Sequence, residues 1–143
     1  IGHLNNVKYL EYMLNAREDH VESGYGFTYE EYTRKTGCTW ITIQNEIAYL
    51  KEVRYNAKVL ISSKTIEVGD RLSKVEILMK SADGKTIHSV LWMSVIYFNM
   101  KTRKSEVHPV DTKRLFERFL VDLEEKDFKS RVSHFRKQNK KAN

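Results

Sequence analysis

The residues best placed to do chemistry stand near the start of the chain, where a Gly-His turn leads into two adjacent asparagines. Gly2 and His3 are followed by Asn5 and Asn6, and a helix is predicted from Val7 onwards. Asparagine is a favoured helix cap, because its side chain accepts a hydrogen bond from a free N–H group of the first turn. A helix start of this kind carries unpaired N–H donors and a positive dipole end, which suits a carboxylate, a phosphate or a developing oxyanion. We therefore expect a negatively charged group to bind there.

The helix that positions this turn is predicted from the spacing of its apolar residues. Valine and leucine recur at positions 7, 10, 14 and 21, and Tyr9, Met13 and Ala16 stand on the flank. This spacing gives one apolar face over roughly four helical turns. The run 23–26, which contains two glycines, predicts the end of the helix.

Four long strands are predicted after the helix. They cover residues 40–50, 57–68, 72–80 and 86–99, and a hairpin turn at 81–85 joins the last two. Alternation in the first strand places Asn45 in a row with Ile43 and Ile47, where its amide either bonds neighbouring backbone or faces a ligand channel. The last strand is apolar on both faces, which predicts a central position covered by a helix on one side and a subunit contact on the other.

A further helix is predicted beyond the strands. Asp111 or Thr112 can cap it, and apolar residues keep helical spacing from Leu115 to Leu123. A long helix, antiparallel strands and a C-terminal helix together predict an α+β domain, which we place at residues 1–125.

The positive charge of the chain is concentrated in its last residues. The net charge is +6, and residues 126–143 alone hold seven basic residues and one acidic residue, so the other 125 residues sum to zero. A body without a basic face argues against nucleic-acid binding. We interpret 126–143 as a solvated basic tail, although Phe128, Val132 and Phe135 would also fit one side of a helix.

Composition places the chain among globular proteins of the cytoplasm. Hydrophobic residues make up 41 % and charged residues 31 %, and no apolar run approaches the roughly 18 residues that span a bilayer. The one cysteine, Cys38, excludes an internal disulfide, favours a reducing compartment, and is expected to be a small buried hydrophobe. The five histidines lack the short spacing of metal ligands, so we expect no metal.

The start of the chain also resembles a known family. The run GHLNNVKYL at residues 2–10, with Ala16, Arg17 and Glu18 beyond it, is similar to the signature of hotdog-fold acyl-CoA thioesterases of the 4-hydroxybenzoyl-CoA thioesterase-like group. Their pattern is Asp-x-x-Gly-His-(Val/Leu)-Asn-Asn-x-x-Tyr-Leu, followed by an Ala-Arg pair. The Asp would stand two places before Ile1. We therefore expect Ile1 to be an internal residue of a longer protein, in which the first strand of the fold also precedes it.

The resemblance implies both a fold and a reaction. In a hotdog fold an antiparallel sheet wraps around a long central helix, and subunits join their sheets edge to edge into a homodimer or tetramer. The reaction is hydrolysis of an acyl-CoA or acyl-carrier-protein thioester to a free acid and a thiol, so coenzyme A is part of the substrate and no further cofactor is expected.

The resemblance also assigns roles to residues. Gly2, His3 and Asn6 would be catalytic. The backbone of residues 2–4 and the helix start would polarise the thioester carbonyl, with His3 and Asn6 lining the site, and the Asp before Ile1 would be nucleophile or general base. His3 has a second interpretation, as a turn histidine that bonds a backbone group. The residues expected to bind substrate are Leu4, Asn5, Tyr9, Asn45 and Arg54. Asn45 is included for its place in the strand row and Arg54 by position only, as a cation that would meet the phosphates of coenzyme A.

The alternative function is a non-catalytic module that binds or senses acyl-CoA on the same fold. The residue two places before Ile1 separates the two hypotheses, because hydrolysis needs the carboxylate and binding does not. A dehydratase on this fold is less favoured, since its His-Phe-Pro-type motif is absent from the sequence.

Overall fold

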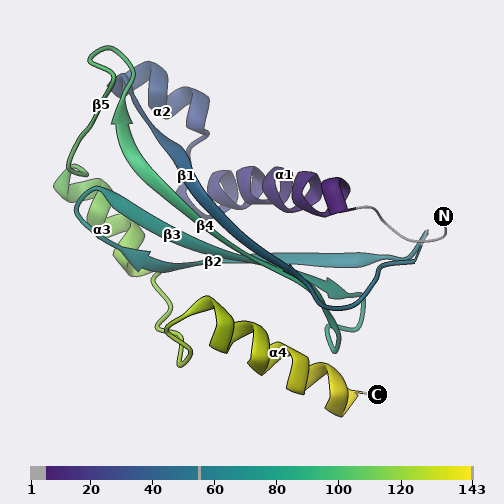
Figure 1. Ribbon diagram of the computed structural model, residues 1–143. Helices are drawn as coiled ribbons and strands as arrows, with labels where there is room; N and C mark the ends of the chain where they lie inside the picture. The colour runs from purple at the N-terminus through teal and green to yellow at the C-terminus, as the bar shows by residue number, and fades with distance from the viewer. Residues whose placement is uncertain (1–5, 55, 143) are drawn as a thin grey trace.

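The computed structural model describes residues 6–54 and 56–142, without the side chains of Asn6 and Val7. A long helix, a short helix, a sheet and two further helices follow one another along the chain (Figure 1). The elements are α1 (Asn6–Tyr25), α2 (Tyr29–Thr36), β1 (Cys38–Tyr49), β2 (Val59–Val68), β3 (Leu72–Ser81), β4 (Ile87–Asn99), β5 (Lys104–Ser105), α3 (Val110–Arg118) and α4 (Phe128–Ala142). The predicted α+β class is confirmed.

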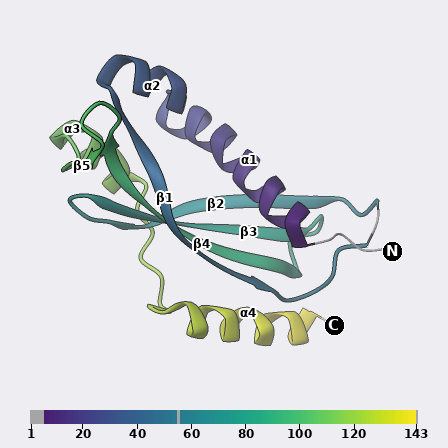
Figure 2. The same cartoon turned by 45° about the horizontal axis from the view of Figure 1, so that its top comes forward.

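The sheet is antiparallel, with its four long strands in the order β1-β4-β3-β2 and with β5 paired to the end of β4. It curves around α1 on one face, and α4 lies along the opposite face (Figure 2). The central position predicted for β4 is therefore confirmed, as is the helix wrapped by the sheet. None of the described helices has both the length and the apolarity needed to cross a membrane.

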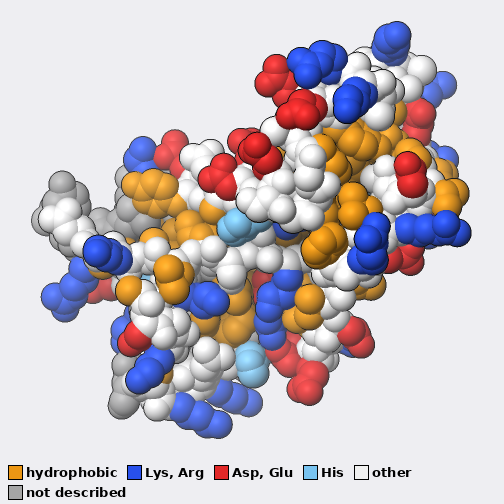
Figure 3. Space-filling view, turned by 180° about the vertical axis from the view of Figure 1, so that it is seen from behind, with side chains coloured by type: hydrophobic (Ala, Val, Ile, Leu, Met, Phe, Trp, Pro, Cys, Tyr) orange, Lys and Arg blue, Asp and Glu red, His pale blue; other side chains and the backbone are white. Residues whose placement is uncertain are grey.

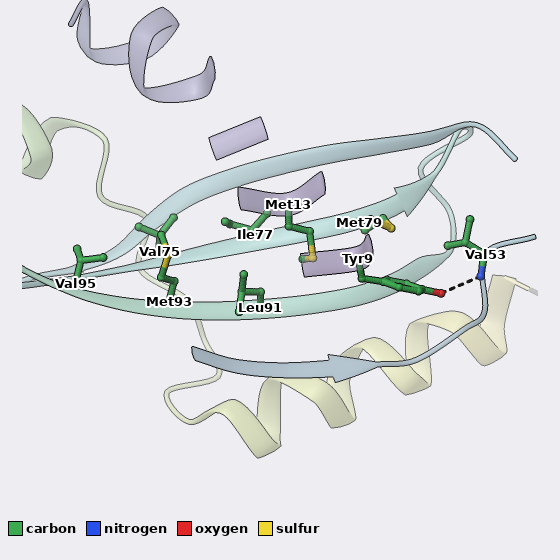
Figure 4. Packing of buried hydrophobic residues seen from close by; sticks show 9 residues of the cluster. All are labelled: Tyr9, Met13, Val53, Val75, Ile77, Met79, Leu91, Met93 and Val95. Carbon is green, nitrogen blue, oxygen red and sulfur yellow. Dashed lines mark hydrogen bonds between the residues drawn. The ribbon is translucent and has the colours of Figure 1, made fainter. Parts of the chain in front are cut away.

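The core on the α1 side is built from one row of the helix and alternate residues of the central strands (Figure 4). Its fully buried members are Tyr9, Met13, Val53, Val75, Ile77, Met79, Leu91, Met93 and Val95. The row that α1 buries is Tyr9, Met13, Arg17 and Val21, at strict four-residue spacing. The buried face therefore differs from the predicted one. Tyr9 and Met13, predicted on the flank, are central to the packing, while Leu10 and Leu14 are only partly buried at its edge.

The opposite face of the sheet is covered by the chain itself. Leu78, Ile87, Val90, Trp92 and Phe135 form a second buried cluster, in which Phe135 comes from α4. The interpretation of 126–143 as a solvated tail is wrong, and it is α4, in place of the predicted subunit contact, that covers this face. The sequence did not reveal this helix as a packed element because its few apolar residues stand among many basic ones. Basic side chains gather on the lower part of the molecule, where α4 lies (Figure 3).

A buried ion pair fastens α4 to the sheet. Arg131 donates from Nε and Nη2 to the two carboxylate oxygens of Glu76, at 2.7 and 2.8 Å, and Glu76 is fully buried in β3. Trp92 donates its indole N–H to the same carboxylate at 2.8 Å. Farther along the helix, the Asn139 amide exchanges two hydrogen bonds with the backbone of Ile87. Polar contacts thus fix the position of α4 along the sheet.

A bulge in β1 changes which residues face α1. Thr42 is paired with Val95 and Gln44 with Ser94, so Ile43 is an extra residue between them. Beyond the bulge, Asn45 is paired with Met93. The predicted continuous row of Ile43, Asn45 and Ile47 is therefore broken, because a bulge reverses the alternation of side chains on either side of it.

The helix predicted near residue 111 begins slightly earlier and ends sooner. Pro109 precedes its first residue, and the structure records no side-chain cap, so neither Asp111 nor Thr112 is the N-cap. Its end at Arg118 is followed by a turn back to the sheet, where the N–H of Val121 donates to the carbonyl of Thr65 at 2.9 Å.

Candidate active site at the start of helix α1

The candidate site lies at the end of the molecule where α1 begins. Helix α1 starts at Asn6, while Gly2, His3, Leu4 and Asn5 lie outside the described residues. Their expected roles therefore remain predictions, as does that of the Asn6 side chain. The first turn of a helix has N–H groups without intrahelical partners, so this end of α1 can donate to an oxyanion.

Tyr9 joins the helix start to the connection between β1 and β2. Its hydroxyl accepts a hydrogen bond from the N–H of Val53 at 2.9 Å and donates to the carbonyl of Lys51 at 3.5 Å. The ring packs edge-on against Tyr49, with centroids 5.2 Å apart. Burial raises the pKa of the Tyr9 phenol, although the Val53 hydrogen bond opposes this. Tyr9 is thus suited to shape a pocket and to stay protonated.

His88 in β4 also forms hydrogen bonds with this connection, and it was not among the predicted site residues. Its carbonyl accepts from the N–H groups of Leu50 and Lys51, at 2.8 and 3.2 Å. Its Nδ1 lies 3.1 Å from the carbonyl of Lys51, which makes Nδ1 the protonated nitrogen. Hydrogen bonds therefore hold residues 50–53 to both α1 and β4, and these residues form a wall beside the helix start.

The two remaining predicted site residues are not brought into contact with Tyr9. Asn45 is exposed on β1, on the face that carries α1, and stands four residues, or about 13 Å along an extended strand, before Tyr49. Arg54 is exposed next to Val53. It therefore stands beside the wall that Tyr9 fixes, while Asn45 lies farther along the sheet.

The far end of the molecule holds an aromatic cluster around His108, which is buried. Trp40 donates its indole N–H to His108 Nε2 at 3.0 Å, and His108 Nδ1 lies 3.1 Å from the carbonyl of Gly69. Nδ1 is therefore the donor and Nε2 the acceptor, which requires a neutral ring. Burial lowers the pKa of His108, opposed by the hydrogen bonds to the Gly69 and Asp70 backbone.

We expect this histidine to make folding pH-dependent. Because its pKa is lowered in the folded state, the unfolded chain binds more protons, so its contribution to stability is complete above the unfolded value of 6.5 and is lost as the pH falls through the folded pKa. Urea unfolding at about pH 7.5 and about pH 5 should show a larger loss for the wild type than for His108→Gln, which cannot titrate. Equal losses would contradict the assignment.

Comparison with known proteins gives the family. A family model described as the thioesterase-like superfamily matches residues 1–132. The chain belongs to this superfamily. The match includes the Gly-His-x-Asn-Asn run, the whole of α1 and every strand, so the thioesterase-like region extends into α4.

Solved structures share the fold. The probable thioesterase YbaW of Escherichia coli is 15 % identical, with a TM-score of 0.72 over 84 % of this chain and 88 % of that one. The DHNA-CoA thioesterase of Staphylococcus aureus is 18 % identical, with a TM-score of 0.71 over 82 % and 78 %. SAV2348 of Staphylococcus aureus, in complex with CoA, is 16 % identical, with a TM-score of 0.69 over 96 % and 75 %. These structures, two of which are named as thioesterases, confirm the hotdog fold. A search of curated proteins finds no match.

Proposed function

We propose that the protein hydrolyses an acyl-CoA thioester at the start of α1. The observation that carries the proposal is that the family match includes the Gly-His-x-Asn-Asn run and that α1 begins at the last residue of this run, Asn6. Attack on a thioester carbonyl creates an oxyanion, and free N–H groups at a helix start stabilise that charge. Gly2, His3 and Asn6 are the residues proposed to polarise the carbonyl.

The attacking group in this proposal is the carboxylate expected two places before Ile1, acting as nucleophile or as general base on water. Tyr9 contributes by fixing the 51–53 backbone as a wall of the pocket, through the two hydrogen bonds of its hydroxyl. The exposed Arg54 beside that wall is proposed to meet the phosphates of coenzyme A. We also propose that two copies assemble with their sheets edge to edge. Strand β2 supports this, because it is an edge strand of the described sheet and its Leu60 side chain is 50 % exposed.

The test is thiol release from a panel of short, long and aromatic acyl-CoAs, using protein that carries its native N-terminal extension. Turnover that disappears when the Asp of the Asp-x-x-Gly-His turn becomes Asn would support hydrolysis. Acyl-CoA binding without turnover would instead favour a non-catalytic binding module.

The same assay tests Arg54. Replacing Arg54 by Ala should raise KM for acyl-CoA more than it lowers kcat, because a contact to the phosphates stabilises the ground state and the transition state alike. Arg34, exposed on α2, offers a matched control, and its replacement by Ala should leave both constants unchanged. An unchanged KM in the Arg54 variant would remove this residue from the site.

A further inference from the structure

The row of α1 that packs on the sheet contains a cation. Arg17 stands between Met13 and Val21 at four-residue spacing and is 92 % buried, being 8 % exposed. Among the described residues, no Asp or Glu lies within salt-bridge distance of its guanidinium. A buried charge without a counter-ion costs free energy, and buried arginines are therefore normally paired.

The groups that do contact this guanidinium are neutral hydroxyls. Nη1 donates to Ser63 Oγ at 3.1 Å, and Nη2 donates over a long 3.4 Å to the hydroxyl of Tyr25. The Tyr29 hydroxyl also interacts with Arg17. The Nε–H donor is buried and has no partner among the described residues. The guanidinium thus lacks a carboxylate partner among the described residues and has a buried donor that none of them uses.

Two hollows meet at Arg17. One is a small cavity of about 20 Å³, lined mainly by apolar and aromatic residues that include Tyr29 and Phe116. The other is an open pocket of about 310 Å³, lined by residues that include His20, Phe119 and Val121 and by no carboxylate. The open pocket is large enough for a small organic molecule, and its exposed lining is mostly apolar.

The histidine in the open pocket adds no second charge. His20 Nδ1 lies 2.6 Å from Ser63 Oγ. Ser63 Oγ accepts from Arg17 and has a second lone pair and a hydrogen of its own, so it can pair with either tautomer of a neutral His20 ring. Burial, and after it the Arg17 charge, lowers the pKa of His20. The side chain of Lys64, which also lines the pocket, extends to Glu76 on the other face of the sheet. The pocket therefore presents a single positive charge.

We propose that this pocket binds a small carboxylic acid as its anion, with the carboxylate on the Arg17 guanidinium and an apolar body against Phe119 and Val121. One positive charge in an apolar pocket suits a monoanion better than a phosphate, and a guanidinium pairs with a carboxylate through charge-assisted hydrogen bonds. The site is distinct from the helix start, because the 11 residues from Asn6 to Arg17 span roughly 16 Å of helix. It does not depend on the proposed hydrolysis.

The test uses the full chain and benzoate as the probe, with benzamide as a neutral molecule of the same shape. Calorimetric titration should show saturable benzoate binding that benzamide does not reproduce. Acetate, which lacks the apolar body, and inorganic phosphate should bind more weakly. Arg17→Gln should weaken benzoate binding by about tenfold or more, while Arg34→Gln, an exposed change on α2, should leave it unchanged.

A second readout separates a ligand site from a structural arginine. Without ligand, Arg17→Gln should be at least as stable as the wild type, because it removes an uncompensated buried charge. Arg17→Lys, which keeps the charge, should retain the preference for benzoate over benzamide. The proposal is overturned if the wild type shows no saturable benzoate binding up to about 10 mM, if benzamide binds equally well, or if Arg17→Gln loses stability but not binding.

Discussion

Replacing Arg131 by Met should lower the free energy of unfolding by about 3–5 kcal/mol. The substitution removes both guanidinium hydrogen bonds from Glu76 and leaves a fully buried carboxylate in the central strand β3. The nearest remaining cation is Lys64, whose Nζ is 3.7 Å from the carboxylate. Because Lys64 partly compensates the charge of Glu76, the loss of unfolding free energy should lie toward the lower end of that range. Urea unfolding followed by tryptophan fluorescence measures the change, and Trp92, which bonds to Glu76, reports on the site directly.

A double variant shows whether the loss comes from the stranded charge. Adding Glu76→Gln to Arg131→Met removes the negative charge yet keeps an acceptor for the Trp92 N–H, so at least half of the stability should return. Asp122→Asn is the exposed control. Its partner is Lys126, and both side chains are mostly solvent-exposed, so the change should stay below about 1 kcal/mol. A double variant no more stable than Arg131→Met would contradict this explanation.

Replacing Phe135 by Ala should cost about 3–5 kcal/mol. The ring is 4 % exposed and fills the space between α4 and the apolar row of Leu78, Val90 and Trp92. It also lies under the Arg131 guanidinium, 4.3 Å from ring centroid to Cζ. Its loss therefore both opens a cavity and weakens the support of the ion pair, so the two substitutions should not be additive.

Thermal or urea unfolding measures this loss against Lys137→Ala, an exposed position on the same helix, which should change stability by less than about 0.5 kcal/mol. If both variants unfolded like the wild type, α4 would contribute nothing to the stability of the sheet, contrary to the buried cluster that it completes.

Arg131 and Phe135 show which part of the fold could not be predicted from the sequence. The first helix and the four strands were predictable because their apolar periodicity is dense and continuous. Helix α4 was not, because Phe128, Val132 and Phe135 are sparse among basic residues, and because the partner of Arg131 is 55 positions away. Charge counting treated Arg131 as solvated, whereas folding pairs it with a residue of the central strand.

The same reason applies to the candidate sites. The motif at residues 2–10 could be found in the sequence, and the roles of its residues 2–6 remain predictions, whereas the structure describes the contacts of Tyr9. Arg17 lies beyond that run, in the Ala-Arg pair of the same signature. The row of Tyr9, Met13, Arg17 and Val21 was a readable signal, since a cation occupies the third position of an otherwise apolar face. No local pattern could identify the neighbours of the Arg17 guanidinium, because Ser63 comes from strand β2, 46 residues farther along the chain.

The bulge in β1 has a consequence for how this strand tolerates changes in length. Because Ile43 is the extra residue, deleting it would leave Thr42 and Asn45 on the same face as before and would restore unbroken pairing with β4. Deleting Ile47 instead would turn the end of the strand over and carry Tyr49 away from Tyr9. Strand β1 should therefore tolerate deletion of one residue at Ile43, with the contact between Tyr9 and Tyr49 kept.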